Sequence, residues 1–113
     1  MSLGSKIAEK RNKQRRAIEV PEWGDDAPLS MYVSAITAGD IDKLQRKHKD
    51  FLNNMTIAGM VDLIIAKAED ADGKRLFTLE DKFTLMAEPV NLIAELAGKM
   101  FADVESIEEQ EKN

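Results

Sequence analysis

The stretch V-P-E-W-G at residues 20–24 decides how the fold begins, and it holds the single tryptophan of the chain. Pro21 has a fixed φ and no N–H to donate to a β-ladder, so it ends a strand. Trp23 carries a large ring that must pack against something, and Gly24 lets the backbone turn. We therefore expect these residues to form either an entrance to the fold or a docking point.

The charge of the chain changes at this stretch. Residues 1–18 carry a net charge of +5, whereas the remaining residues carry −10. Apolar spacing is weak before residue 17, so residues 1–16 are expected to form a basic leader with a weak, solvated helix. A nucleic-acid-binding arm is the less favoured interpretation, because no aromatic side chain lies among the basic ones to stack on bases.

Short segments with β character lie on both sides of the turn. Residues 17–20 and 29–36 partly alternate between apolar and polar, and the turn-forming residues 24–28 lie between them. This pattern predicts a short antiparallel hairpin. Such a hairpin is marginal alone and must pack on helices.

From Thr37 onward, apolar residues recur every three or four positions, which is typical of helices. The pattern predicts a first helix that continues through Leu52 and a second, the most buried, over residues 56–68. Thr37 and Thr78 occupy capping positions, each followed by acidic residues in the first helical turn.

The C-terminal part continues this helical pattern. After Thr78, the residues Leu79, Phe83 and Met86 line one side of a helix. Pro89 either begins a new helix or kinks a continuous one. The last helix carries an apolar stripe over residues 90–104.

These elements predict a mainly α fold: a small helical domain of about four to five helices with a short N-terminal β-hairpin. The domain is expected to span residues 17–105, and the Glu-rich residues 106–113 to form an acidic flexible tail. There is no cysteine, which excludes disulfides and zinc–thiolate sites. No apolar run approaches the roughly 18–20 residues of a membrane span, so we expect a soluble protein with no membrane partner.

The sequence shows no catalytic constellation. The single histidine, His48, lies between two lysines and is interpreted as a surface residue. The D-A-D-G segment at residues 70–73 partly matches a calcium-binding loop, but Ala68 and Leu79 would fall at its first and last ligand positions. This segment is therefore interpreted as an acidic turn. We expect no enzymatic activity, no cofactor and no metal.

Protein binding is the function that remains to be considered. Methionine is flexible and polarizable and adapts to varied apolar partners, and a wide helical stripe can complete its burial against another helix. The alternative for these side chains, Trp23 included, is packing within the protein's own core. The candidates for protein contact are Trp23, Met60, Ile93, Met100 and Phe101.

Three local patterns follow one another along the chain: I-E-V-P-E-W-G at residues 18–24, V-S-A-I-T-A-G-D at residues 33–40, and D-A-D-G-K-R-L-F-T-L-E-D at residues 70–81. In this order and spacing they resemble the tail assembly chaperones of long-tailed, siphovirus-type bacteriophages and prophages. The resemblance covers roughly residues 15–105.

The resemblance implies a chaperone that binds the tape measure protein, keeps it soluble and helps to recruit tail tube subunits. It also implies location in the host cytoplasm and absence from the mature virion. This chain would be the short form, and a longer frameshifted form would contact the tail tube protein. Self-association is a further expectation, motivated by the surplus apolar stripe.

Two other interpretations remain open. One is a structural head-tail or tail component of the virion. The other is a small regulatory nucleic-acid-binding protein that uses the basic leader and would bind with steep salt dependence.

Overall fold

The computed structural model describes the backbone of residues 2–13 and 15–112, and the side chains of residues 2–10 and 15–101. Within these residues, five α-helices and a two-stranded antiparallel hairpin form a mainly helical fold, which confirms the predicted fold class. The elements are α1 (Leu3–Lys13), β1 (Arg15–Val20), the short 3-10 helix η1 (Pro21–Trp23), β2 (Leu29–Ser34), α2 (Ala38–Lys47), α3 (Ile57–Lys67), the 3-10 helix η2 (Leu79–Asp81), α4 (Lys82–Met86) and α5 (Val90–Lys112).

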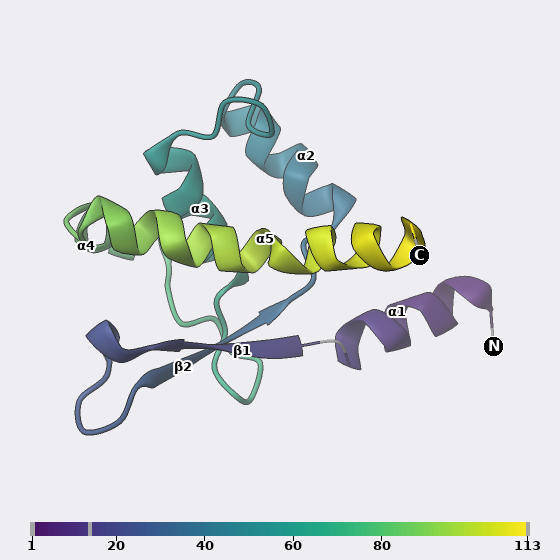
Figure 1. Cartoon of the computed structure of the whole chain (residues 1–113), viewed down its shortest axis with the longest axis horizontal. Helices are drawn as coiled ribbons and strands as arrows, with labels where there is room; N and C mark the ends of the chain where they lie inside the picture. Colours follow the sequence, from purple (N-terminus) through teal and green to yellow (C-terminus); the bar gives the residue numbers. More distant parts are fainter. Residues whose placement is uncertain (1, 14, 113) are drawn as a thin grey trace.

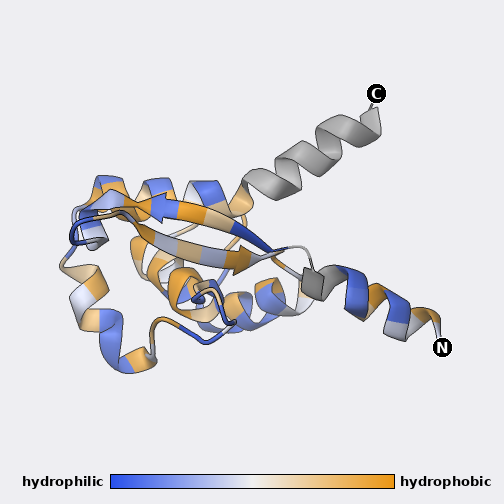
Figure 2. Cartoon of the chain, turned by 90° about the horizontal axis from the view of Figure 1, so that it is seen from below, coloured by the Kyte–Doolittle hydropathy of each residue, from blue (hydrophilic) through white to orange (hydrophobic). Residues whose placement is uncertain are grey.

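Helix α5 runs along the molecule, with the hairpin on one side and helices α2 and α3 on the other (Figure 1). Helix α4 lies at the start of α5, and α1 extends away from the body at the opposite end. Seen from below, the hairpin lies across the helices (Figure 2). The hydrophobic core therefore lies between the hairpin, α3 and α5, and includes Met31, Ile64, Leu96 and Met100.

The hairpin forms as its alternation predicts. β1 pairs antiparallel with β2, with Ile18 opposite Met31. Every second side chain is buried, as a strand with one face on the core requires. β1 begins at Arg15 rather than at residue 17, so Arg15 and Arg16 of the expected leader belong to the hairpin.

The side chains of these two arginines are engaged with the body. The Arg15 guanidinium donates to the carbonyl of Asp70 at 2.5 Å, pairs with Glu69 at 3.2 Å, and lies 5.3 Å from the centroid of the Tyr32 ring. Arg16 donates to the carbonyl of Lys99 in α5. Both residues therefore hold β1 against neighbouring segments, whereas all described side chains of α1 are exposed.

Among the side chains that the structure describes, those of helix α3 are the most completely buried, as expected. Helix α2 begins where its cap predicts. The Thr37 hydroxyl accepts from the Asp40 backbone N–H at 3.1 Å, and the Asp40 carboxylate accepts from the Thr37 N–H at 2.9 Å. The predicted continuation of this helix through Leu52 is wrong, because α2 ends at Lys47. Asp50 has a φ of 59°, a left-handed conformation that a right-handed helix cannot include.

Pro89 separates two helices rather than kinking one. Helix α4 ends at Met86 and α5 begins at Val90, and the Pro89 carbonyl accepts the N–H of Ile93 at 3.2 Å. The expected acidic tail at residues 106–113 lies outside the residues whose side chains are described, so it stays a prediction. In the part of the chain that the structure describes, no helix has both the length and the apolar content that crossing a membrane demands.

The 20–24 stretch folds back on the body through Trp23. The edge of its ring meets Phe77, with ring centroids 5.6 Å apart and planes at 77°. Its indole N–H donates to the carboxylate of Glu88. At Gly24 the chain passes so close to itself that a β-carbon would lie 2.0 Å from the Ala27 carbonyl oxygen and 2.8 Å from the Leu29 nitrogen. Glycine is therefore required here by lack of space and not by its backbone conformation, because other residues also adopt a φ of −97°.

This close approach makes Gly24→Ala destabilising. We expect the free energy of unfolding to fall by about 1–3 kcal/mol, because the neighbouring atoms belong to the backbone and cannot move aside. Gly98→Ala is the matched control: its β-carbon meets nothing within 4 Å, and it should stabilise α5 by about 0.5–1 kcal/mol. Urea unfolding of both variants measures the difference, and equal stability of the two would contradict the close approach.

Candidate functional site

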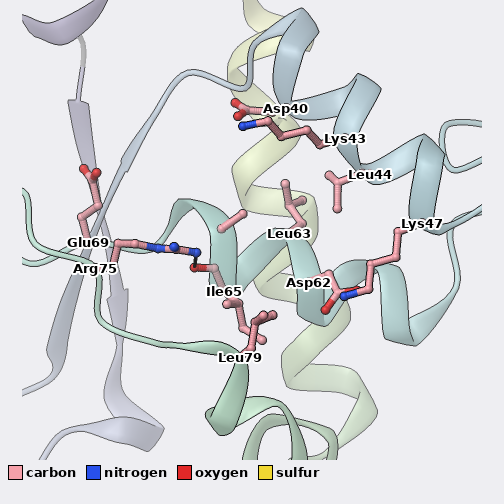
Figure 3. A pocket seen from close by; sticks show the side chains of 11 residues that line it. Asp40, Lys43, Leu44, Lys47, Asp62, Leu63, Ile65, Glu69, Arg75 and Leu79 are labelled. Atoms are coloured by element: carbon pink, nitrogen blue, oxygen red, sulfur yellow. Dashed lines mark hydrogen bonds and ion pairs between the residues drawn. The ribbon is translucent and has the colours of Figure 1, made fainter.

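A groove opens between α2, α3 and the segment that leads into η2 (Figure 3). Its volume is about 400 Å³, and its wall includes the apolar side chains of Leu44, Leu63 and Leu79. The charged residues Asp40, Lys43, Lys47, Asp62, Glu69 and Arg75 surround it. Groups of this kind could serve a ligand only if the chain itself does not already pair them.

Asp62 on α3 is the centre of the groove's charges, and only 6% of it is exposed. Its carboxylate lies 2.5 Å from His48 Nε2, 3.4 Å from Lys47 Nζ and 3.2 Å from Lys82 Nζ. Burial alone would raise the pKa of Asp62, but the hydrogen bonds from His48 and Lys82 and the two lysine charges outweigh it and lower that pKa below 3.8. This carboxylate therefore stays ionised and ties α3 to the end of α2 and to α4.

A second ion pair, partly buried, involves Asp40 in the wall of the groove. Lys67 lies 2.9 Å from the Asp40 carboxylate and donates to the Ser34 hydroxyl at 3.0 Å and the Ala35 carbonyl at 3.2 Å. Burial tends to raise the pKa of Asp40, and the bonds from Thr37 and Lys67 lower it on balance. These contacts join α2, α3 and the end of β2.

Two further charged residues of the groove are also paired within the chain. The Arg75 guanidinium donates to the Ile65 carbonyl at 3.1 Å, and Glu69 is held by Arg15. Figure 3 shows Lys47 pointing toward Asp62 and Arg75 reaching toward α3. Most of the groove's charged groups thus serve the fold, and we assign the groove a structural role.

The acidic segment at residues 70–73 is a turn, as interpreted from the sequence. One carboxylate oxygen of Asp70 accepts the backbone N–H groups of Asp72 and Lys74, both at 2.9 Å, and Gly73 has a φ of 86°. Within the described side chains, no three histidine, aspartate or glutamate residues gather in a way that could hold a metal ion.

The second candidate for a binding surface is made of exposed apolar side chains. Leu79, Phe83, Met86 and Val90 follow one another at spacings of four, three and four residues, and they are 68, 89, 44 and 55% exposed. We call these four residues the apolar ridge. Leu85 points the other way and is only 2% exposed, so it anchors α4 in the core. Exposed apolar residues gathered in this way mark interaction sites more often than isolated ones do.

The sequence predicted that Leu79, Phe83 and Met86 share one side of a helix, and the structure places that side toward solvent. The pattern could not show this direction, because an inward and an outward stripe have the same period. Leu85, which is out of phase with the stripe, is the only sequence signal that a second face of α4 exists.

The structure places the five predicted contact residues in the hydrophobic core or against it. Ile93 and Met100 are each 1% exposed and lie in the core, so their predicted place in a contact surface is corrected: the stripe on α5 is covered by α3 and the hairpin. Trp23, Met60 and Phe101 are partly buried and pack against that core. None of the five belongs to the apolar ridge.

Sequence reasoning also missed the Asp62 cluster. The interpretation of His48 as a surface residue is wrong, since its side chain is only 14% exposed and contacts Asp62. The available signal was an aspartate within the apolar run of α3, because a carboxylate there must find cations or pay a large desolvation cost.

Comparison with known proteins gives one informative result. No protein-family model matches the chain, and no curated protein sequence matches it. Among solved structures, the arrangement of helices and hairpin is similar to that of a phage tail assembly chaperone. The protein concerned is the tail assembly chaperone of bacteriophage HK97, with a TM-score of 0.53 and 15% sequence identity over 79% of this chain and 83% of that one. This chain therefore has the fold that the sequence motifs suggested.

We expect Asp62→Asn to lower the free energy of unfolding by about 2–3 kcal/mol, because it leaves His48, Lys47 and Lys82 without their anion. The matched control is Asp42→Asn, which removes an exposed pair with Arg46 at 3.0 Å and should cost less than about 0.5 kcal/mol. Chemical denaturation at neutral pH compares them, and equal effects would contradict the central role of Asp62.

The same pair of proteins gives a pH test. A carboxyl whose pKa is lowered by folding contributes stability above its unfolded pKa and loses it as pH falls through the folded pKa. Because the pKa of Asp62 is lowered from 3.8, the stability difference between wild type and Asp62→Asn should be constant near neutral pH and shrink below about pH 4. A difference that grows with acidification would show the opposite sign of shift.

Proposed function

We propose that this protein is a tail assembly chaperone of a long-tailed bacteriophage or prophage, which binds the tape measure protein and keeps it soluble during tail assembly. The observation that carries the proposal is the shared fold with the HK97 tail assembly chaperone over 79% of the chain. The three ordered sequence motifs, which point to the same class, support it independently.

The apolar ridge supplies the chemistry that this role needs. A tape measure protein presents long apolar helical stripes, and a row of residues at spacings of four, three and four matches the spacing of such a stripe. Phe83, 89% exposed, is an aromatic anchor of the kind that contributes most to protein interfaces. The net negative charge of the residues after residue 18 would keep the complex with the tape measure protein, here called the client, soluble.

The rest of the proposal concerns assembly. The chaperone acts in the host cytoplasm, recruits tail tube subunits through a longer frameshifted form, and leaves before the virion is complete. Copies arrayed along one client gain avidity even when each contact is weak, so self-association is part of the proposal.

The test is co-expression with the tape measure protein of the same genome. We expect that protein to precipitate alone, and to remain soluble and co-purify when the chaperone is present. The double variant Phe83→Ser with Met86→Ser should reduce the co-purified amount at least tenfold, since removal of an aromatic anchor costs about 2 kcal/mol or more. Ile7→Ser is the control: Ile7 is 53% exposed on α1, at the far end of the molecule (Figure 1).

A tape measure protein that is indifferent to the chaperone would overturn the proposal. The two other interpretations each have a distinct signature in the same preparation. A virion component would be found in purified particles, and a nucleic-acid-binding protein would shift DNA or RNA in a gel at low salt and lose the shift at high salt.

A further inference from the structure

The apolar ridge runs into an acidic hollow at the start of α5. The hollow has a volume of about 320 Å³ and is lined by Glu22, Glu88, Pro89, Asn91, Leu92 and Glu95. All three charged residues in this lining are glutamates. Pro89 and Asn91, which line the hollow, flank Val90, the last residue of the ridge, so the two surfaces adjoin at the start of α5.

The fold holds the hollow in place. Glu22 comes from η1, whereas the other lining residues come from α5 and the residues just before it. The Trp23 indole N–H donates to Glu88 and so joins the two segments. On α5, Leu92 and Ile93 are buried, whereas Asn91 and Glu95, four residues apart, are exposed together on one side of the helix.

The carboxylates of Glu22 and Glu95 remain open to a partner. Glu22 is exposed. Glu95 lies 3.2 Å from Lys99, but both side chains are about half exposed, and an exposed pair of this kind contributes little and exchanges readily. A partner's cation that enters the hollow would meet two or three carboxylates at once.

We propose that the ridge and the hollow together bind one amphipathic helix of the client, whose apolar stripe is bordered by lysine or arginine at the end that meets the hollow. This inference rests on the proposed function for the nature of the client, and adds the charge that the surface selects. The ridge takes the apolar positions, while Glu22 and Glu95 pair with the cations. Acidic helices with the same apolar stripe are rejected, because like charges across an interface oppose binding.

The dimensions suit a short helical segment. The ridge runs from Leu79 in η2 through α4 to Val90 at the start of α5, and its helical part, residues 79–86, corresponds to roughly 12 Å, or a little over two turns. A client helix of about four to five turns would cover the four apolar side chains and place its last turn over the hollow. The size of the surface thus suits one helical segment of the client rather than an extended peptide.

Three synthetic helices of about 18 residues test the selection. They share one apolar stripe, contain no tryptophan, and carry lysine, glutamine or glutamate beside the stripe. Trp23 is the only tryptophan of the chain and contacts Glu88 at the hollow, so its fluorescence reports binding directly. We expect the lysine peptide to bind more tightly than the glutamine peptide by about three- to tenfold at low salt, with the difference reduced at high salt. The glutamate peptide should bind most weakly.

Two variants locate the effect. Phe83→Ser should abolish binding of all peptides, because it removes the main apolar contact without touching the core. The double variant Glu22→Gln with Glu95→Gln should bring the lysine peptide to the affinity of the glutamine peptide and leave the latter unchanged. Asp42→Asn, on the exposed side of α2, is the control that should preserve the preference.

Equal binding of the three peptides, or a preference that survives the double variant, would overturn the proposal. So would a concentration-dependent mass in sedimentation that Phe83→Ser abolishes and the lysine peptide does not compete with, since the ridge would then be covered by a second copy. None of these measurements uses the tape measure protein, so the co-expression test can fail while the charge selection holds, and the reverse.

Discussion

The ion cluster around Asp62 is the constraint on which the rest of the helical layer depends. A carboxylate on the most buried helix must be compensated, and its three partners come from outside α3: Lys47 and His48 from the end of α2, and Lys82 from α4. Breaking such a group is costly because the remaining charges stay partly desolvated. One aspartate thus sets how α2 and α4 are placed against α3.

This placement matters most for α4. A helix of five residues, Lys82–Met86, has no stability of its own in water. Its orientation comes from two contacts: Leu85 is buried in the core, and Lys82 lies against Asp62. With Leu85 directed inward, Phe83 lies on the opposite side of the helix and faces outward, and Met86 is left partly exposed beside it. The exposed apolar ridge is therefore a consequence of the same contacts that stabilise the fold.

The hollow beside the ridge depends on a different contact, the one between Trp23 and Glu88. The stretch at residues 20–24 turns the hairpin so that its connection packs on Phe77 and on the start of α5. The tryptophan is thus mainly a structural residue, and its role in binding would be to hold Glu22 and Glu88 at one site. In the role proposed above, such a surface would combine apolar contact area with a fixed local charge, which favours tight binding together with discrimination between helices.

The amino-acid sequence by itself determined the fold class, the hairpin and the capped start of α2, because each follows from local chemistry such as alternation and a capping threonine. At Pro89 it left two outcomes open, and the structure decided for a separate start of α5. The sequence also carried the motifs whose resemblance agrees with the fold of the HK97 chaperone. Only the tertiary structure decided which apolar stripes are covered. Ile93 and Met100 lie inside and Phe83 lies outside, although all three sit in stripes of helical period. Periodicity shows that residues share a face, whereas the partner of that face, whether core, water or another protein, is set by contacts between segments distant in sequence, such as the one between Asp62 and Lys82.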